Sequence, residues 1–235
     1  MNTDADLLKQ FLGLELSEKQ IELFEKYKSC FLEKNAQINL ISKNDEKFLF
    51  EKHIFDSLAI HKFFSTIKNV DLLPPPLRGR VGVGGNPHRL LDIGTGGGFP
   101  SVPISIAYEN VNVFAIDSIR KKITIIEALK ADLELKNLFP ICDRVEKLVF
   151  KNNFKAYDFI TTRAVAPMDV ILKYALPNLK SGGYFIAYKS KKALEELSEA
   201  KATLKIFGAK LHEIIDYQLP LEEVYERNLI IVQKK

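Results

Sequence analysis

The chain has 235 residues, with 34 basic and 30 acidic side chains and a formal net charge of +4. This length fits one domain with a small extension, and so small a net charge permits a nucleic-acid partner without requiring one. Cys30 and Cys142 lie too far apart in sequence for a zinc motif, and the four histidines form no ligand cluster, so we expect no metal site and a reducing compartment. The N-terminus lacks the long apolar run of a signal peptide or membrane span, and we therefore expect a cytoplasmic protein that uses no membrane.

Residues 1–70 carry apolar side chains at helical spacing. The stripes consist of Leu7, Leu8, Phe11 and Leu12, then Ile21, Phe24, Tyr27 and Phe31, then Phe50, Ile54 and Leu58. Ser17 followed by Gln20 is typical of a capping box at the start of the second helix. The pattern predicts an N-terminal helical extension.

The composition changes at residues 71–88, which contain three consecutive prolines and four glycines. Prolines and glycines at this density cannot maintain a helix or a central strand, so we predict an insertion or linker. The arginines of this segment leave a second interpretation open, an electrostatic arm that holds RNA.

Predicted strands and helices alternate over residues 89–235. The expected strands lie near residues 89–93, 111–117, 139–142, 157–163, 183–189, 210–218 and 228–233, and the expected helices near 100–108, 119–136, 168–180 and 191–207. This alternation predicts an α/β domain with a seven-stranded, mostly parallel sheet and helices on both faces. No helix separates the last two strands, so we expect the final strand to lie antiparallel at the edge of the sheet.

The most informative segment is the glycine-rich turn that follows the first of these strands. Gly94, Gly96 and Gly98 allow a sharp turn with positive φ and let a ligand approach the main chain. The next strand ends at Asp117, about 20 residues beyond, where a carboxylate can accept hydrogen bonds from two ribose hydroxyls. Together they predict a nucleoside cofactor site, and the alternative role for Asp117 is a cap on the helix that follows.

Phe99 indicates which nucleoside is bound. A dinucleotide fingerprint has a third glycine at this position, for close helix packing and a pyrophosphate at the helix N-terminus. A bulky ring there fits a cofactor without a pyrophosphate, and we expect the ring to wall one side of that cofactor. We therefore predict S-adenosyl-L-methionine and a Rossmann-like methyltransferase fold in preference to a nicotinamide cofactor. A P-loop is excluded because no Lys-Ser or Lys-Thr follows the glycines.

Six short motifs occur in the order found in one known family. They are Asn39-Leu40, Lys52 to Leu58, Leu91 to Pro100, Asp117-Ser118, Arg144 to Glu146 and Thr162 to Ala164. With them the chain resembles, over nearly its whole length, the bacterial 16S ribosomal RNA guanine-N7 methyltransferases (RsmG, formerly glucose-inhibited division protein B). The resemblance implies methyl transfer from S-adenosyl-L-methionine to N7 of one guanine, with 16S rRNA or the small ribosomal subunit as partner. We expect the enzyme to be a monomer.

The resemblance also implies roles for individual residues. The expected cofactor-binding residues are Gly94, Gly96, Phe99, Asp117, Val145, Glu146 and Arg163. Val145 and Glu146 would hold the adenine edge, or else only begin a solvated helix. Arg163 and His53 are the expected catalytic residues. The alternative for Arg163 is a salt bridge that braces the sheet, and the alternative for His53 is a purely structural histidine. A basic cluster beside the site would meet phosphates or form a solvated face, and it consists of Lys121, Lys122, Lys189, Lys191 and Lys192.

The chain departs from the family pattern in three places. Lys52 stands where the family usually has arginine, and Ile41 stands where a threonine often follows Asn-Leu. The connector at residues 71–88 is also longer than usual. Lys52 keeps the positive charge but loses the planar fork that clamps a phosphate, which weakens the expectation of that contact.

Features that the chain lacks also favour N7 as the target. The turn after the fourth predicted strand, Thr161 to Pro167, has no Asn-Pro-Pro-aromatic motif for exocyclic amines, and neither cysteine is placed for carbon-5 methylation. Guanine N7 already offers a lone pair, so the reaction needs positioning and no general base. N7 faces the closed major groove of A-form RNA, so the target should be unpaired or flipped out.

Two alternatives to an RNA guanine-N7 methyltransferase are a methyltransferase for a small metabolite and a cofactor-binding RNA module without activity.

Overall fold

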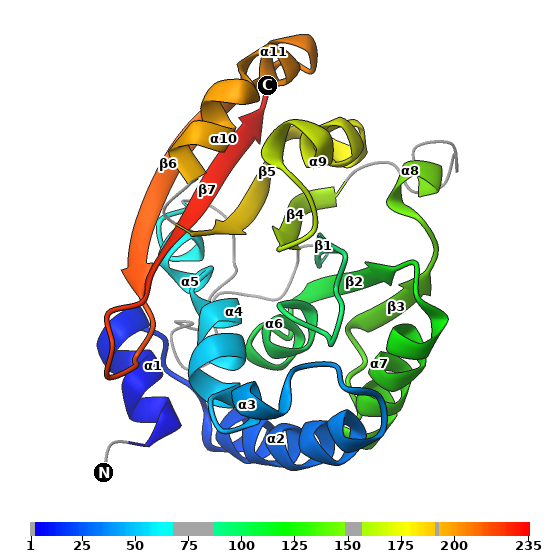
Figure 1. The fold of residues 1–235 in the computed structure, drawn as a ribbon, viewed down its shortest axis with the longest axis vertical. Coiled ribbons are helices and arrows are strands. Elements are labelled where there is room, and N and C mark those ends of the chain that lie inside the picture. The colour runs from blue at the N-terminus through cyan, green and yellow to red at the C-terminus, as the bar shows by residue number, and fades with distance from the viewer. Residues whose placement is uncertain (1–2, 68–86, 149–156, 191–192) are drawn as a thin grey trace.

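Seven strands form a sheet in the computed structural model, which describes residues 3–67, 87–148, 157–190 and 193–235 (Figure 1). The strands are β1 (His88–Ile93), β2 (Val111–Asp117), β3 (Leu138–Cys142), β4 (Tyr157–Arg163), β5 (Leu179–Lys189), β6 (Ala209–Gln218) and β7 (Glu226–Lys234). Their order is β3-β2-β1-β4-β5-β7-β6, and the pairs from β3 to β5 are all parallel. The predicted seven-stranded, mostly parallel sheet is confirmed, whereas the insertion predicted at residues 71–88 lies almost wholly outside the described residues.

The prediction that the final strand lies at the edge of the sheet was wrong. β7 is antiparallel as expected, but it lies between β5 and β6 and pairs with both. Residues Leu229 to Val232 of β7 are all buried, which suits a strand covered on both faces. β6 exposes Lys210 to Glu213 in succession, and charged side chains are typical of an edge strand.

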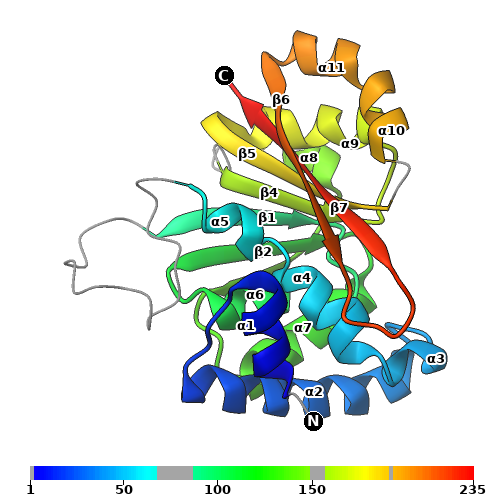
Figure 2. The same cartoon turned by 90° about the vertical axis from the view of Figure 1, so that its left-hand side faces the viewer.

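Helices cover both faces of the sheet, which Figure 2 shows nearly edge-on. One layer consists of α9 (Met168–Ala175), the 3-10 helix η3 (Leu176–Asn178), α10 (Ala193–Glu199) and α11 (Lys201–Ile206), and the other includes α6 (Ser101–Ala107) and α7 (Arg120–Asp132). The helix predicted at 168–180 ends early because Pro177 cannot continue α-helical hydrogen bonding, and β5 starts directly afterwards. The helix predicted at 191–207 is two short helices that meet at Ala200. Among the described residues, no helix combines the length and apolar character needed to cross a membrane.

The N-terminal extension packs onto the α6 and α7 face of the sheet. It contains α1 (Asp4–Leu12), α2 (Glu18–Ile38), α3 (Lys43–Glu46), the π-helix η1 (Leu49–Phe55), α4 (Asp56–Leu58) and α5 (His61–Phe64). The predicted capping box is present, because the Ser17 and Gln20 side chains each bond to the backbone N–H of the other residue. The Gln20 side chain also donates to the carbonyls of Ile106 and Ala107, which fixes α2 against the end of α6. The apolar residues of the extension therefore share one core with this face of the sheet.

Candidate active site

A pocket of about 340 Å³ lies at the carboxyl ends of β1, β2 and β4. Its lining residues are Ile93, Gly94, Ile116, Asp117, Ser118, Lys122, Asp143, Arg144, Val145, Glu146, Ala164 and Val165. The chain runs from β1 outward through β2 and β3, and returns to the other side of β1 at β4. Ligands of open α/β sheets bind at such a reversal of strand order. The pocket brings together four of the predicted cofactor residues, namely Gly94, Asp117, Val145 and Glu146.

The glycine-rich turn has the backbone conformation that the sequence predicts. Gly94, Gly96 and Gly98 all have left-handed φ values, of 70°, 57° and 91°. A Cβ on Gly94 would collide with the side chain of Val165, which lies in the loop after β4, and a Cβ on Gly98 would lie 2.7 Å from a methyl of Val102. The absence of a side chain at Gly94 therefore lets the two loops that border the pocket approach each other.

Asp117 joins the glycine-rich turn to the start of α7. Its carboxylate accepts hydrogen bonds from the backbone N–H of Gly96 at 3.0 Å and from that of Ile119 at 2.9 Å. The Lys122 ammonium lies 3.9 Å from the same carboxylate. The carboxylate has about four lone-pair sites, so two backbone donors leave capacity for hydroxyl donors from the pocket. The contact with Ile119 lies two residues along the chain, just before α7, and α7 itself has no side-chain cap hydrogen bond, so the helix-capping alternative for Asp117 is not what the structure shows.

Arg163, the last residue of β4, is held by the N-terminal extension. One guanidinium nitrogen donates to Asp56 at 3.0 Å and to the Lys52 carbonyl at 3.3 Å, and the other lies 3.0 Å from Nδ1 of His53. The salt bridge considered from the sequence is thus present, but it braces the extension against the sheet. Arg163 does not itself line the pocket, although the next residue, Ala164, does.

His53 is a neutral hydrogen-bond acceptor toward Arg163. A guanidinium can only donate, so Nδ1 of His53 accepts and the ring proton lies on Nε2. Burial, aided by the positive charge of Arg163, lowers the pKa of His53 to about 4. Nε2 is buried and has no hydrogen-bond partner among the described residues. The ring is consequently a poor general base, because its only lone pair is already used.

Asp56 and Asp92 are buried carboxylates with opposite pKa shifts. Burial by itself raises the pKa of Asp56, but the charges of Arg227 and Arg163 outweigh it, so the pKa lies below its ordinary value. Asp92, on β1, has one hydrogen bond at 3.0 Å from the Thr161 hydroxyl, while its second oxygen has no partner among the described residues. Burial raises the pKa of Asp92 to about 6. The spacing of three residues between His53 and Asp56 predicted that these two side chains share one helical face. Nothing in the sequence singled out Asp92 or Arg227.

The Phe99 ring packs between the glycine-rich turn and the helical extension. Its side chain is 4% exposed and does not line the pocket. The ring lies 5.1 Å from that of Phe31 and 5.0 Å from that of His53, and the Arg163 guanidinium lies 5.2 Å from its centre. The ring therefore fastens the glycine-rich turn to the helical extension, which is too distant in sequence for local patterns to reveal. The expected role of Phe99 as a wall of the cofactor site stays a prediction.

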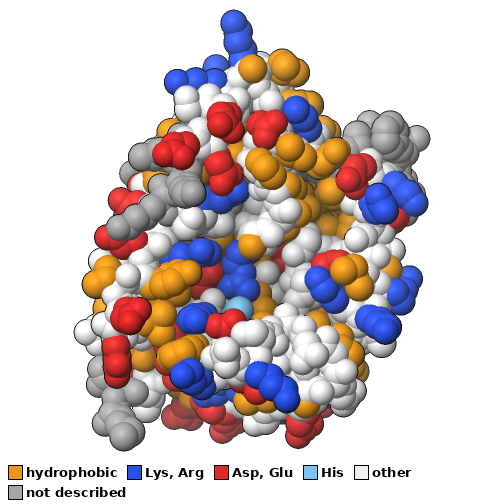
Figure 3. Space-filling model, viewed as in Figure 1, with side chains coloured by type: hydrophobic (Ala, Val, Ile, Leu, Met, Phe, Trp, Pro, Cys, Tyr) orange, Lys and Arg blue, Asp and Glu red, His pale blue; other side chains and the backbone are white. Residues whose placement is uncertain are grey.

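The structure describes three lysines of the predicted basic cluster, Lys121, Lys122 and Lys189. Lys122 lines the pocket, but Lys189 is 13% exposed and donates to Glu196 at 2.6 Å and to the Ala166 carbonyl at 3.2 Å. Lys191 and Lys192 lie outside the described residues. Figure 3 shows this face of the molecule hollowed near its middle, with Lys, Arg and His side chains beside the hollow. Of the lysines that the structure describes, Lys122 brings positive charge to the pocket, and a contact of the cluster with phosphates stays a prediction.

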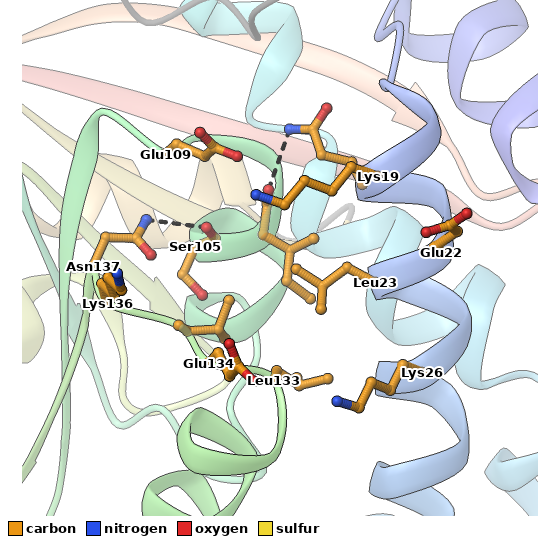
Figure 4. Close-up of a pocket in the computed structure, with 13 residues that line it drawn as sticks. Lys19, Glu22, Leu23, Lys26, Ser105, Glu109, Leu133, Glu134, Lys136 and Asn137 are labelled. Atoms are coloured by element: carbon orange, nitrogen blue, oxygen red, sulfur yellow. Dashed lines mark hydrogen bonds between the residues drawn. The ribbon is translucent and has the colours of Figure 1, made fainter.

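A larger pocket, of about 590 Å³, lies between α2, α6 and the turn before β3 (Figure 4). Its rim carries three lysines and three glutamates, which gives no net charge for a charged ligand to recognise. Its two amide side chains already donate to the backbone, Gln20 to Ile106 and Asn137 to Ser105. It contains none of the predicted site residues, so we assign the chemistry to the smaller pocket at the strand ends.

Known structures share the architecture of the sheet domain. A TM-score of 0.51 relates 62% of this chain to 47% of NSun6 from Pyrococcus horikoshii, at 17% identity. TYW2 of M. jannaschii, solved in complex with AdoMet, gives a TM-score of 0.50 over 65% of this chain and 72% of that chain, at 15% identity. At these identities the likeness shows the fold alone.

Sequence comparison is more specific. The model of the GidB family, rRNA small subunit methyltransferase G, matches residues 81–228. The ribosomal RNA small subunit methyltransferase G of Staphylococcus saprophyticus is 36% identical over 95% of this chain and 85% of that protein, and that of Lachnoclostridium phytofermentans is 37% identical over the same shares. This chain, with its glycine-rich turn and Asp117 at one pocket, therefore belongs to the rRNA small subunit methyltransferase G family.

Proposed function

We propose that this protein transfers a methyl group from S-adenosyl-L-methionine to N7 of a guanine in the 16S rRNA of the small ribosomal subunit. The observation that carries the proposal is the pocket at the strand ends, built by Gly94, Asp117, Val145 and Glu146 in a chain of this family. The family membership does not favour the alternative of a small-metabolite methyltransferase. Our expectations of a cytoplasmic monomer that acts without a metal remain part of the proposal.

The lining of the pocket fits the proposed cofactor. Asp117 offers carboxylate lone pairs to two ribose hydroxyls from the end of β2. Ile93, Ile116 and Val145 supply apolar surface, which suits an adenine ring. Glu146 lies beside Val145 at the start of α8 (Val145–Leu148), where an acceptor for the adenine amino group is needed. When bound, the cofactor supplies an electrophilic methyl group on a sulfonium.

The side chains next to the pocket suit a nucleophile that needs no deprotonation. His53 has its lone pair directed to Arg163 and its proton on Nε2, so it cannot remove a proton from a substrate. Arg163 therefore supplies positive charge and His53 a ring N–H, and neither side chain is a base. Guanine N7 has a free lone pair, and positioning it in line with the methyl group is sufficient for transfer.

The experiment supplies methyl-labelled S-adenosylmethionine and small ribosomal subunits from a strain that lacks this activity. The wild-type protein should label the 16S rRNA, and Asp117→Ala should reduce labelling at limiting cofactor. Asp132→Asn, at the far end of α7, is the matched control and should behave as the wild type does. Labelling of small molecules in a cell extract, with none in rRNA, would overturn the proposal.

A further inference from the structure

Asp56 is the centre of a hydrogen-bond network that ends at Arg163. The side chain is 2% exposed and accepts hydrogen bonds from three residues. Arg163 donates at 3.0 Å, Tyr217 at 2.6 Å, and Arg227 through two nitrogens at 3.2 and 3.3 Å. Both carboxylate oxygens are thus occupied by charged or hydroxyl donors, and the geometry of this group is fixed on all sides.

The donors lie on three strands of the sheet, β4, β6 and β7. Tyr217 at the end of β6 and Arg227 at the start of β7 are directly opposite each other in the antiparallel pair. Arg163 is opposite Tyr188 of β5, and the Tyr188 hydroxyl donates to the carbonyl of Ser57 at 2.7 Å, next to Asp56. The start of α4 is therefore attached to the ends of four strands at once.

The charges in this cluster make Asp56 indispensable to the orientation of Arg163. His53 is neutral, and the Asp56 carboxylate lies between two guanidinium groups, those of Arg163 and Arg227. Without that carboxylate the two partly buried cations would repel each other, and of the hydrogen bonds described for Arg163 those with the Lys52 carbonyl and His53 would remain. Arg163 is the last residue of β4 and immediately precedes Ala164 of the pocket, so a shift of its guanidinium would displace charge beside the active site while the paired backbone of β4 stays in place.

We propose that Asp56 is a positioning residue for methyl transfer: it holds Arg163, and through it the His53 ring, in the orientation that the reaction needs, with Tyr217 and Arg227 as its anchors. The inference rests on the proposed function, since it assigns Asp56 to the same site. It implies that the β6–β7 pair, which does not line the pocket, contributes to turnover.

A double-mutant cycle separates this role from a purely structural one. Asp56→Asn should lower kcat by at least about tenfold, because small misplacements at a reacting centre have large effects on rate. The dissociation constant of S-adenosylhomocysteine, measured by calorimetry, should stay within about threefold, because the cofactor pocket is left intact. In an Arg163→Lys background the same change should lower kcat by less than about threefold, since coupled residues are not additive. An equal loss of kcat in both backgrounds would overturn the proposal.

Tyr217→Phe provides a milder variant if Asp56→Asn does not fold. It removes one hydroxyl and should still lower kcat, with unchanged cofactor affinity, whereas Tyr225→Phe on the exposed turn of the same pair should have no effect. A Tyr217→Phe enzyme with wild-type kcat would overturn the proposal.

Nitrogen NMR of the histidine rings gives a readout that needs no turnover. The His53 signals, identified by their loss in His53→Gln, should show a proton on Nε2 and a hydrogen-bonded Nδ1 in the wild type, and they should shift in Asp56→Asn or Tyr217→Phe. Unshifted His53 signals would overturn the proposal. Failure of the wild type to methylate rRNA would instead refute the proposed function, and the NMR result would still decide whether Asp56 orients Arg163 and His53.

Discussion

Asp92 should make the protein less stable as the pH rises, and Asp92→Asn should remove this effect. Burial raises the pKa of Asp92 from 3.8 to about 6, so the folded state binds this proton more tightly than the unfolded state does. Its contribution is fully favourable below pH 3.8 and is lost as the pH rises through about 6. The difference of about two units corresponds to roughly 3 kcal/mol of lost stability at high pH, and about half of that loss falls between pH 5 and 8.

The assay is urea unfolding of wild type and Asp92→Asn at several pH values from about 5 to 8. The amide keeps an acceptor for the Thr161 hydroxyl but adds a buried donor, whose cost of about 1–3 kcal/mol does not depend on pH. The free energy of unfolding of the variant should therefore rise relative to that of the wild type by roughly 1–2 kcal/mol across this range. Ile160→Val, on the neighbouring strand β4, is the control and should differ from the wild type by a constant amount. A constant difference for Asp92→Asn as well would refute the reasoning.

Three further predictions concern the site. Asp117→Ala should weaken S-adenosylhomocysteine binding by roughly 1.5–3 kcal/mol in calorimetry, and an unchanged affinity would mean that the cofactor binds elsewhere. Arg163→Ala should abolish methyl transfer and also lower the free energy of unfolding by about 3 kcal/mol, because it breaks the pair with buried Asp56; a wild-type urea midpoint would contradict this. Gly94→Ala should weaken cofactor binding because its methyl collides with Val165, and adding Val165→Ala should recover part of the affinity; no recovery would show that the positive φ of Gly94 matters more than the collision.

Local patterns predicted the sheet and the glycine-rich turn well. Strands β1 and β2 are apolar runs with clear ends, and the ends predicted for them differ from those observed by at most one residue. The left-handed φ values of Gly94 and Gly96 follow from the glycines themselves. The position of Asp117 beside the turn follows from two adjacent parallel strands, since the carboxyl ends of such strands meet at one edge.

Long-range packing could not be predicted from the same patterns. Asp56 and Arg227 are 171 residues apart, and nothing in the local sequence of either indicates the other. The contacts of Phe99 with Phe31 of α2 and His53 of η1 also lay beyond local patterns, because these residues are far from it in sequence. The position of β7 inside the sheet also depends on long-range packing. A strand lies in the interior when helices cover both of its faces, as the buried residues of β7 show, and local patterns do not predict where those helices pack.

Nucleoside analysis of the product tests the central claim most directly. Small ribosomal subunits that lack the modification are incubated with the wild-type protein and S-adenosyl-L-methionine, and the 16S rRNA is then digested and examined by mass spectrometry. The proposed reaction predicts one 7-methylguanosine per RNA, at a single unpaired guanine, and less of it with Asp117→Ala at limiting cofactor. A methyl group on an exocyclic amine, on a pyrimidine carbon or on ribose would contradict it.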